Sequence, residues 1–130
     1  MNKVIGILGG TFDPPHWGHI RLAEHFSGTL QLDELFWLPS GEPWQKGAHI
    51  TPAKDRLDMT IAAADVLKEE LQAKNIDTKV MVDSMEIDRG GPSYTIDSAK
   101  ELRQKFGPDV SLIWLMGADS FLQLYTWNDW

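Results

Sequence analysis

The chain has 130 residues, no cysteine, and 19 acidic against 12 basic residues, which gives a formal charge of −7. This length suits one domain with a core of its own, and the lack of cysteine excludes disulfides and thiolate metal sites. The negative charge argues against a broad surface for nucleic acid or anionic membrane, although it leaves room for a small basic pocket that binds phosphates.

The first two elements are predicted to be a strand and a helix. An apolar run at residues 4–8 is typical of a buried strand, and Ile20, Ala23 and Phe26 then recur with helical spacing. Between them lies a stretch, residues 9–19, with two glycines at its start and two histidines near its end.

This stretch reads Gly-Gly-Thr-Phe-Asp-Pro-Pro-His-Trp-Gly-His and predicts a phosphate cradle. Glycines let backbone amides approach a ligand closely, and the start of a helix favours anions. His16 and His19 are three residues apart, so in a helix they share a face and offer two hydrogen-bond donors. An ordinary turn, in which both histidines merely cap or pack, is the alternative. The backbone of the cradle would come from Gly9, Gly10, Thr11 and Phe12.

The middle of the chain repeats the alternation of strand and helix. Residues 35–39 predict a second strand, and a polar loop follows over residues 40–50. Thr51 is a good N-cap with Pro52 at the first helical position, so a helix is predicted from there to about residue 74. Its apolar stripe consists of Leu57, Ile61, Ala64, Leu67 and Leu71.

The last third of the chain is predicted to hold one more helix between two strands. Ser93 or Thr95 would cap this helix, and Gly107 with Pro108 would end it. The other predicted elements are a strand at residues 79–82, a connector at residues 83–91 with a short extended piece at residues 85–87, and a buried strand at residues 110–116.

Alternating strands and helices predict an α/β fold, with a parallel sheet, right-handed crossovers and helices on both faces. Such sheets bind ligands at the carboxyl ends of their strands, near a switch in strand order. The places that fit this rule are residues 9–19, 39–46 and 117–127. The sequence has neither the dinucleotide-binding nor the P-loop glycine fingerprint.

Two basic side chains near these strand ends are candidates for binding. Lys46 could reach phosphates as a point charge, and a solvated surface lysine is the alternative. Arg56 is placed one turn into its helix and faces back toward the loop that holds Lys46. An exposed charge, or a salt bridge to Asp55 or Glu70, would explain Arg56 equally well.

Two candidates follow the last predicted strand. Asp119 could accept hydrogen bonds from ribose hydroxyls, although carboxylates also commonly cap helices. Trp127 could stack on a flat heterocycle, although in a chain with six tryptophans packing is the commoner fate of any one of them. His25 and His49 have no evident partner and are predicted to lie on the surface.

Five segments carry a resemblance to a known family: residues 9–19, 38–46 (Leu-Pro-Ser-Gly-Glu-Pro-Trp-Gln-Lys), 56–59, 91–95 (Gly-Pro-Ser-Tyr-Thr), and 117–120 followed by Thr126 and Trp127. Together they resemble the bacterial nicotinate-nucleotide adenylyltransferases. That family belongs to the nucleotidylyltransferases with a His-x-Gly-His element, which class I aminoacyl-tRNA synthetases share. The similarity runs over all 130 residues, and residues 91–95 are its most discriminating part.

The resemblance implies a Rossmann-like, doubly wound parallel sheet of the nucleotidylyltransferase type that ends before its last strand and C-terminal helix. It also implies transfer of AMP from ATP to nicotinate mononucleotide, which gives deamido-NAD and pyrophosphate. The mononucleotide phosphate would attack the α-phosphorus in line, and Mg²⁺ would travel with the ATP phosphates. Positioning and charge stabilisation would then be the main tasks of the site.

The resemblance also implies a role for each candidate residue. The ATP site would consist of Gly9, Gly10, Thr11, Phe12, Lys46 and Asp119, with His16 and His19 as the catalytic residues. The nicotinate mononucleotide site would consist of Arg56, Thr95 and Trp127, and no residue is assigned to a metal ion.

Members of the resembled family continue past Trp130, so we expect the chain to be a fragment with little or no adenylyl transfer. Exposed apolar sheet would then favour association between copies or leave the ATP site open. No apolar run approaches the ~20 residues of a membrane span, and no signal-peptide pattern is present. A cytoplasmic protein without membrane or nucleic-acid partners is therefore expected.

Three other functions stay open at this point. Transfer to phosphopantetheine or an alcohol phosphate would keep the fold, but residues 91–95 argue against it. A non-catalytic nucleotide-binding module could keep the cradle without needing both histidines. Metal binding by His16 and His19 lacks a convincing third ligand beyond Asp13.

Overall fold

The computed structural model describes residues 3–43, 50–89, 92–93 and 95–115. Over these ranges the chain forms a four-stranded parallel sheet of order β4-β2-β1-β6 and a small sheet of β3 and β5. The strands are β1 (Val4–Gly10), β2 (Glu34–Pro39), β3 (Glu42–Pro43), β4 (Lys79–Val82), β5 (Pro92–Ser93) and β6 (Ser111–Leu115). The helices are α1 (Trp17–Thr29), α2 (Ala53–Ala73), α3 (Met85–Arg89) and α4 (Thr95–Phe106).

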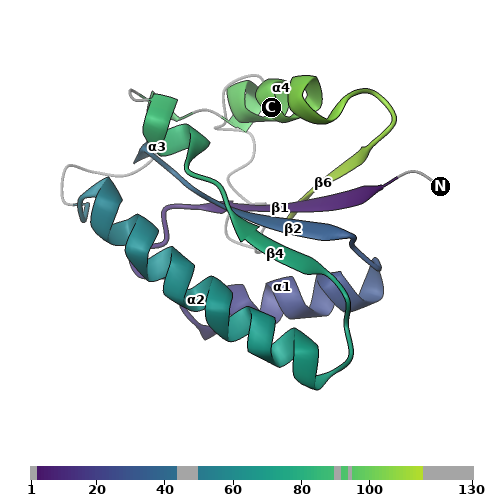
Figure 1. Cartoon of the computed structure of the whole chain (residues 1–130). Helices are drawn as coiled ribbons and strands as arrows, with labels where there is room; N and C mark the ends of the chain where they lie inside the picture. The colour runs from purple at the N-terminus through teal and green to yellow at the C-terminus, as the bar shows by residue number, and fades with distance from the viewer. Residues whose placement is uncertain (1–2, 44–49, 90–91, 94, 116–130) are drawn as a thin grey trace.

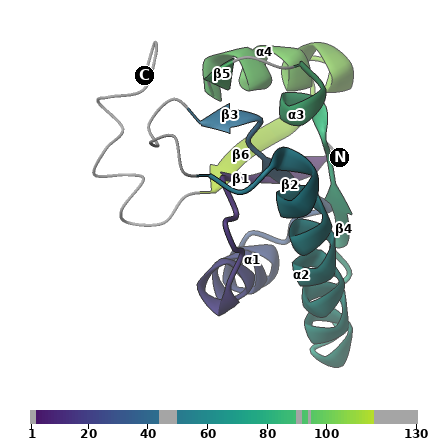
Figure 2. The ribbon, with the colours of Figure 1, turned by 90° about the vertical axis from the view of Figure 1, so that its left-hand side faces the viewer.

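The large sheet is covered on both faces: α1 and α2 lie on one side, and α3 and α4 on the other (Figure 1). Figure 2 shows the same layers after a 90° turn. Successive residues of a strand point to opposite faces, and so Ile7 and Leu8 of β1 belong to two separate apolar cores. The core under α1 and α2 includes Leu67, whereas the core under α4 includes Leu102. The predicted α/β architecture is confirmed.

The loops after β1 and β2 start side by side. The register pairs Gly10 with Pro39, which are the last residues of the two strands. The Ser40 amide then donates to the Gly10 carbonyl at 2.9 Å. Strand β1 also has β6 as its other neighbour, so the carboxyl end of β1 is a point at which the strand order switches. A ligand site is expected at such a point.

The start of α2 differs from the prediction. The helix begins at Ala53 with Pro52 as N-cap, and no side chain hydrogen-bonds its first amides. The expectation that Thr51 is the N-cap is therefore wrong. The Thr51 amide instead donates to the Asp13 carboxylate at 2.9 Å, so the chain leading into α2 is fastened to the loop after β1.

The buried face of α2 also differs from the predicted stripe in its first half. Leu67 and Leu71 are buried as expected, but Ile61 is 43% exposed. The polar residues Arg56 and Thr60 are buried instead. Arg56 faces loop backbone and donates to its carbonyls, whereas the Thr60 hydroxyl donates to the Arg56 carbonyl of the same helix at 2.7 Å. The later turns of α2 face the apolar side of the sheet.

Residues 85–87 are helical, as part of α3, and the predicted extended piece is wrong. The Asp83 carboxylate accepts a hydrogen bond from the Met85 amide, which favours a turn at that point. Helix α4 begins at Thr95 and ends before Gly107, whose φ of 84° favours glycine, as predicted. None of the helices within the described ranges is both long and apolar enough for a membrane crossing.

Candidate functional site

The two histidines form the N-terminal cap of α1. The Nδ1 atom of His16 accepts a hydrogen bond from the Gly18 amide at 3.0 Å. The Nδ1 atom of His19 reaches back and accepts one from the His16 amide, also at 3.0 Å. Their rings stack with centroids 3.9 Å apart and an interplanar angle of 28°. Both histidines therefore cap the helix through Nδ1, which leaves the Nε2 atom of each ring outside the cap.

Capping through Nδ1 decides which ring nitrogen carries the proton. A nitrogen that accepts a backbone N–H bears no hydrogen of its own, so in both neutral rings the proton lies on Nε2. Burial, and next the neighbouring His16, lower the pKa of His19 to about 4, so this ring is neutral at physiological pH. Neither Nε2 has a hydrogen-bond partner among the described residues. The pair thus presents two Nε2–H donors at the start of α1.

Gly18 and Phe12 hold this geometry in place. A Cβ on Gly18 would lie 2.8 Å from Cε1 of His16, so only glycine lets the His16 ring fold over the start of the helix. Phe12 is buried and meets the His19 ring edge to face, with centroids 5.0 Å apart. Phe12 has a φ of 53°, a left-handed conformation that costs energy in a residue with a side chain.

Asp13 fastens the loop after β1 to the segment before α2. Its carboxylate accepts the Thr51 amide, and hydrogen bonds from the Thr51 side chain and backbone lower the pKa of Asp13, with a smaller contribution from Arg56. Asp13 is therefore an ionised anchor at neutral pH. Among the described residues, no three His, Cys, Asp or Glu side chains are arranged to hold a metal ion.

Arg56 is buried, with 1% of its surface exposed, and it bonds only to backbone oxygens in the described structure. It donates to carbonyls of three chain segments, so the alternatives of an exposed charge or a salt bridge to Asp55 or Glu70 are excluded. Its hydrogen bonds go to the carbonyl oxygens of Thr11 (3.0 Å), Ser40 (2.6 Å), Gly41 (2.8 Å) and Thr51 (2.8 Å).

A second polar cluster lies in the layer of α3 and α4. The buried Glu86 carboxylate accepts a hydrogen bond from the Ser98 hydroxyl at 2.5 Å, and Arg89 donates to the same hydroxyl at 2.9 Å. Burial raises the pKa of Glu86 to about 6, although Ser98 and Arg89 oppose the shift. A Cβ on Gly41 would lie 2.5 Å from the Glu86 carbonyl oxygen, so the loop after β2 packs directly on α3.

The structure brings most of the described candidates to one edge of the sheet. His16 stacks on His19, whose ring contacts the Phe12 side chain, and Arg56 donates to the Thr11 carbonyl in the same loop. Thr95 is the first residue of α4, on the opposite face of the sheet. His25 is exposed, as predicted. Outside the described residues lie Lys46, His49, Asp119 and Trp127.

Sequence reasoning missed the residues that hold the site together. Asp13 was considered only as a weak metal ligand, and Thr51 only as a helix cap. No local pattern around Asp13 or Thr51 indicates that these two residues, 38 positions apart, form a hydrogen bond. Glu86 and Ser98 carry no sequence pattern that would have paired them.

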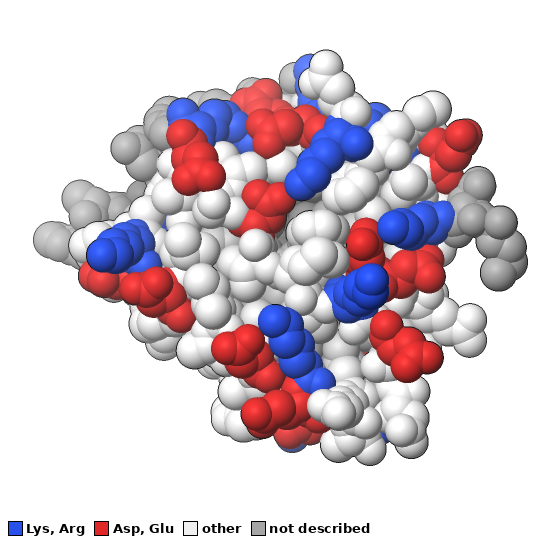
Figure 3. Space-filling model, in the orientation of Figure 1, with Lys and Arg blue, Asp and Glu red and all other residues white. Residues whose placement is uncertain are grey.

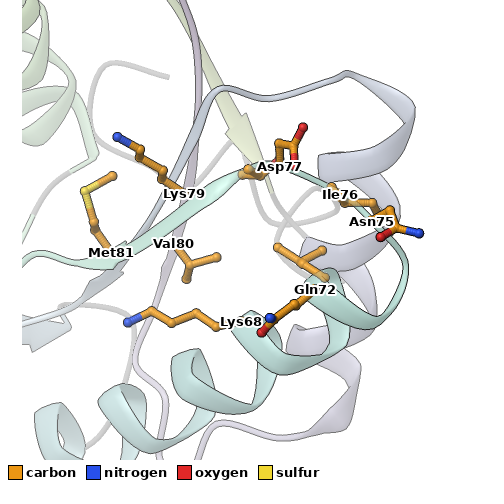
Figure 4. Close-up of a pocket in the computed structure, with 10 residues that line it drawn as sticks. Lys68, Gln72, Asn75, Ile76, Asp77, Lys79, Val80 and Met81 are labelled. Carbon is orange, nitrogen blue, oxygen red and sulfur yellow. The ribbon is translucent and has the colours of Figure 1, made fainter.

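A groove of about 510 Å³ lies elsewhere, between the end of α2 and β4 (Figure 4). Its walls include Lys68 and Gln72 from α2 and Lys79 and Val80 from β4. The residues before β4 contribute as well, which puts the groove at the amino end of that strand, away from the cradle. We therefore do not assign it to the candidate site.

Charges are intermixed on the face shown in Figure 3, where acidic and basic side chains alternate. Several charged side chains of the described residues are paired. Arg21, for example, lies 3.0 Å from Glu24 and 3.6 Å from Glu70. This surface therefore has the mixed character of a solvated exterior rather than of a single-sign binding face.

Known proteins with similar sequences share one activity in their names. A family model described as Cytidylyltransferase-like matches residues 7–130. "Probable nicotinate-nucleotide adenylyltransferase" of Herminiimonas arsenicoxydans is 39% identical over 130 residues, which is 100% of this chain and 55% of that protein. The protein of the same name from Corynebacterium glutamicum is 41% identical over 127 residues, which is 97% of this chain and 53% of that protein. The chain thus spans about half the length of the curated relatives it matches.

Solved structures agree on the fold. Plasmodium falciparum nicotinic acid mononucleotide adenylyltransferase complexed with NaAD has a TM-score of 0.77 at 18% identity, covering 98% of this chain and 58% of that chain. The same enzyme complexed with APC has a TM-score of 0.69 at 18% identity, covering 98% of this chain and 57% of that chain. Both likenesses support the Rossmann-like arrangement described above.

Proposed function

The chain belongs to the cytidylyltransferase-like family, and from that premise we propose that it carries the catalytic fold for transfer of AMP from ATP to nicotinate mononucleotide. The products would be deamido-NAD and pyrophosphate. The names of the relatives support this acceptor, since the two described above are called nicotinate-nucleotide adenylyltransferases. The solved structure with NaAD supports it as well, because NaAD is the dinucleotide such a reaction forms.

The observation that carries the proposal is the pair of Nε2–H donors at the carboxyl end of β1. Both rings are fixed by their Nδ1 hydrogen bonds, so both donors point away from the start of the helix. A preorganised donor needs no reorganisation when charge builds up on a phosphate oxygen, and its removal typically costs about 3–4 kcal/mol of transition-state stabilisation.

In the proposed reaction, an oxygen of the mononucleotide phosphate forms a bond to the α-phosphorus of ATP. The bond from that phosphorus to the bridging oxygen breaks, and pyrophosphate leaves with the electron pair. No proton has to be moved by the protein. His16 and His19 would donate to the triphosphate oxygens, and the amides of residues 9–12 would hold the phosphates.

The remaining assignments are part of the same proposal. Mg²⁺ would arrive with ATP, held by phosphate oxygens and water, because the Asp13 carboxylate is engaged by Thr51. Thr95 would bind the mononucleotide from the start of α4. Lys46, Asp119 and Trp127 would contribute as predicted from the resemblance. The proposed setting is the cytoplasm, and association between copies of the chain belongs to the proposal too.

Calorimetry and product analysis test this function together. We expect the chain to bind ATP with Mg²⁺, and His16→Ala to weaken that binding at least about tenfold, since it removes one charge-assisted hydrogen bond. His25→Ala is the matched control, because His25 is an exposed histidine of the same helix. Failure of the wild-type chain to bind ATP would contradict the proposal.

The acceptor is tested by supplying different phosphates. Pyrophosphate release is measured with ATP and either nicotinate mononucleotide, nicotinamide mononucleotide or phosphopantetheine, in this chain and in one extended past Trp130. We expect nicotinate mononucleotide to give the highest turnover in the extended chain. Faster turnover with phosphopantetheine would assign another acceptor, and ATP binding without release from either chain would indicate a binding module.

A further inference from the structure

Arg56 joins three segments that are far apart in the sequence. Its Nη1 atom bonds to the Thr11 carbonyl in the loop after β1 and to the Ser40 carbonyl in the loop after β2. Its Nη2 atom bonds to the Gly41 carbonyl, and its Nε atom to the Thr51 carbonyl before α2. Four of its five N–H groups thus point at backbone oxygens.

Only arginine can make this set of bonds. The guanidinium is planar and presents its donors in a fixed fork, whereas the lysine ammonium is a compact point charge on a flexible stem. Burial lowers the pKa of Arg56 from its ordinary value while Asp13 raises it, and arginine remains a cation under any physiological condition. Its partners are neutral carbonyls, so the charge strengthens several hydrogen bonds at once.

The bond to Thr11 has a consequence on the other side of the same peptide. In a trans peptide the carbonyl and the following amide point in opposite directions. Because the Thr11 carbonyl points at the buried guanidinium, the Phe12 amide N–H points away from Arg56. Phe12 also has the left-handed φ of 53°, a conformation that persists only where its surroundings enforce it.

We propose that Arg56 is a positioning residue for the phosphate cradle: by holding the Thr11 carbonyl it aims the Phe12 amide at the ATP phosphates, without touching the nucleotide itself. This rests on the proposed function, in that ATP is taken as the ligand of the cradle. It replaces the expectation that Arg56 contacts nicotinate mononucleotide. The bonds to Ser40 and Gly41 extend the same control to the loop after β2.

The first test is made on the wild-type chain by amide and guanidinium NMR. On addition of ATP with Mg²⁺, we expect the Phe12 amide resonance to move and the Arg56 Nε–H resonance to move far less. A guanidinium resonance that shifts as much as that of Phe12 would indicate direct contact and overturn the proposal. If no resonance shifts and calorimetry finds no binding, the proposed function fails instead.

The second test replaces the arginine. In Arg56→Lys and Arg56→Gln, we expect the Phe12 amide resonance to be displaced before any ATP is added, and ATP affinity to fall at least about tenfold. Because the displacement is read without ligand, it tests the positioning step even if ATP is not the ligand. Unchanged Phe12 resonances in both folded variants would overturn the proposal.

Two controls separate positioning from a loss of stability. Leu67→Ala removes a fully buried side chain from the later turns of α2, far from the loops, and is expected to lower stability while leaving ATP affinity within about twofold. Arg56→Ala supplied with millimolar guanidinium chloride is expected to regain ATP affinity, as the free ion refills the site. Equal weakening by Leu67→Ala, or no recovery with guanidinium, would assign Arg56 a purely structural role.

Discussion

Helices α1 and α2 both begin at the carboxyl edge of the sheet, yet their first turns are built in opposite ways. The start of α1 is exposed and capped by its own side chains, through the two Nδ1 atoms of His16 and His19. The start of α2 has no side-chain cap, and it buries a cation, Arg56, whose donors bind carbonyls of other segments.

The two helix starts therefore differ in what their side chains do: that of α1 leaves donors free for a ligand, and that of α2 holds the surrounding loops in place. At the start of α1, the acceptor nitrogens are used for capping and the donor nitrogens remain available to an incoming phosphate. At the start of α2, a full positive charge lies near the cradle, but its hydrogen bonds hold backbone in place. A phosphate at this site would therefore meet neutral N–H donors first, while the buried charge acts on it mainly through the shape of the loops.

The largest effect is expected from removing the buried cation. Arg56→Met would leave four carbonyl oxygens without their donor, so we expect a loss of about 3–5 kcal/mol in the free energy of unfolding. Urea denaturation at neutral pH measures it. The matched control is Arg21→Met, since Arg21 is an exposed arginine of α1 whose ion pairs with Glu24 and Glu70 are worth at most about 1 kcal/mol. Equal losses in the two variants would erase the distinction drawn between the helices.

A smaller effect is expected at the start of α1. His16→Ala removes the cap on the Gly18 amide, and such a change typically costs about 1 kcal/mol of stability. His16→Asn provides an effective cap again but no imidazole donor, so stability should recover while ATP affinity stays low. Thermal unfolding and calorimetry on the same samples check both statements. Recovery of ATP affinity in His16→Asn would show that the ring is needed for capping alone.

The smallest effect is a dependence of stability on pH, because two groups oppose each other. His19 has a folded-state pKa of about 4, below its ordinary 6.5. Its contribution to the free energy of unfolding is therefore lost as the pH falls from 6.5 toward 4. Glu86 has a folded-state pKa of about 6, above its ordinary 4.5, so its contribution is present below pH 4.5 and is lost as the pH rises through 6.

Replacing one of the two groups at a time should reveal how the other changes the free energy of unfolding with pH between pH 4.5 and 6. Compared with the wild-type chain, His19→Gln should make stability fall more with rising pH, since only the Glu86 contribution remains of the two. Glu86→Gln should make stability fall more with falling pH, since only the His19 contribution remains. Urea unfolding at several pH values in this range gives the slopes, and two variants with the same slope as the wild-type chain would show that neither group is perturbed.

The sequence predicted those features that depend on local pattern. The apolar run of β1, the helical spacing of α1 and the glycine that ends α4 all have short-range causes, and each lies where it was expected. The pairing of His16 with His19 also follows from spacing alone. Which ring nitrogen faces outward does not follow from spacing, because it depends on the φ and ψ of the cap and on the room that Gly18 leaves.

The features that were missed depend on contacts across long stretches of chain. The sequence places Arg56 one turn into its helix and facing the loop, but no local pattern shows that the carbonyls of Thr11 and Ser40 converge on it from 45 and 16 residues away. The exposure of Ile61 follows from this, since the helix turns its polar side inward where it meets the loops. In the five-residue helix α3, periodicity has too few residues to be read.

The central claim is that two neutral imidazoles donate through Nε2 to the phosphates of ATP. It is tested most directly by nitrogen NMR of the side chains of His16 and His19 during titration with ATP and Mg²⁺ at neutral pH. We predict that both rings show a protonated Nε2 and a bare Nδ1 throughout, and that both Nε2 resonances move with ATP but not with adenosine at the same concentration. Rings protonated on Nδ1, or Nε2 resonances that stay fixed while ATP binds, would contradict the account.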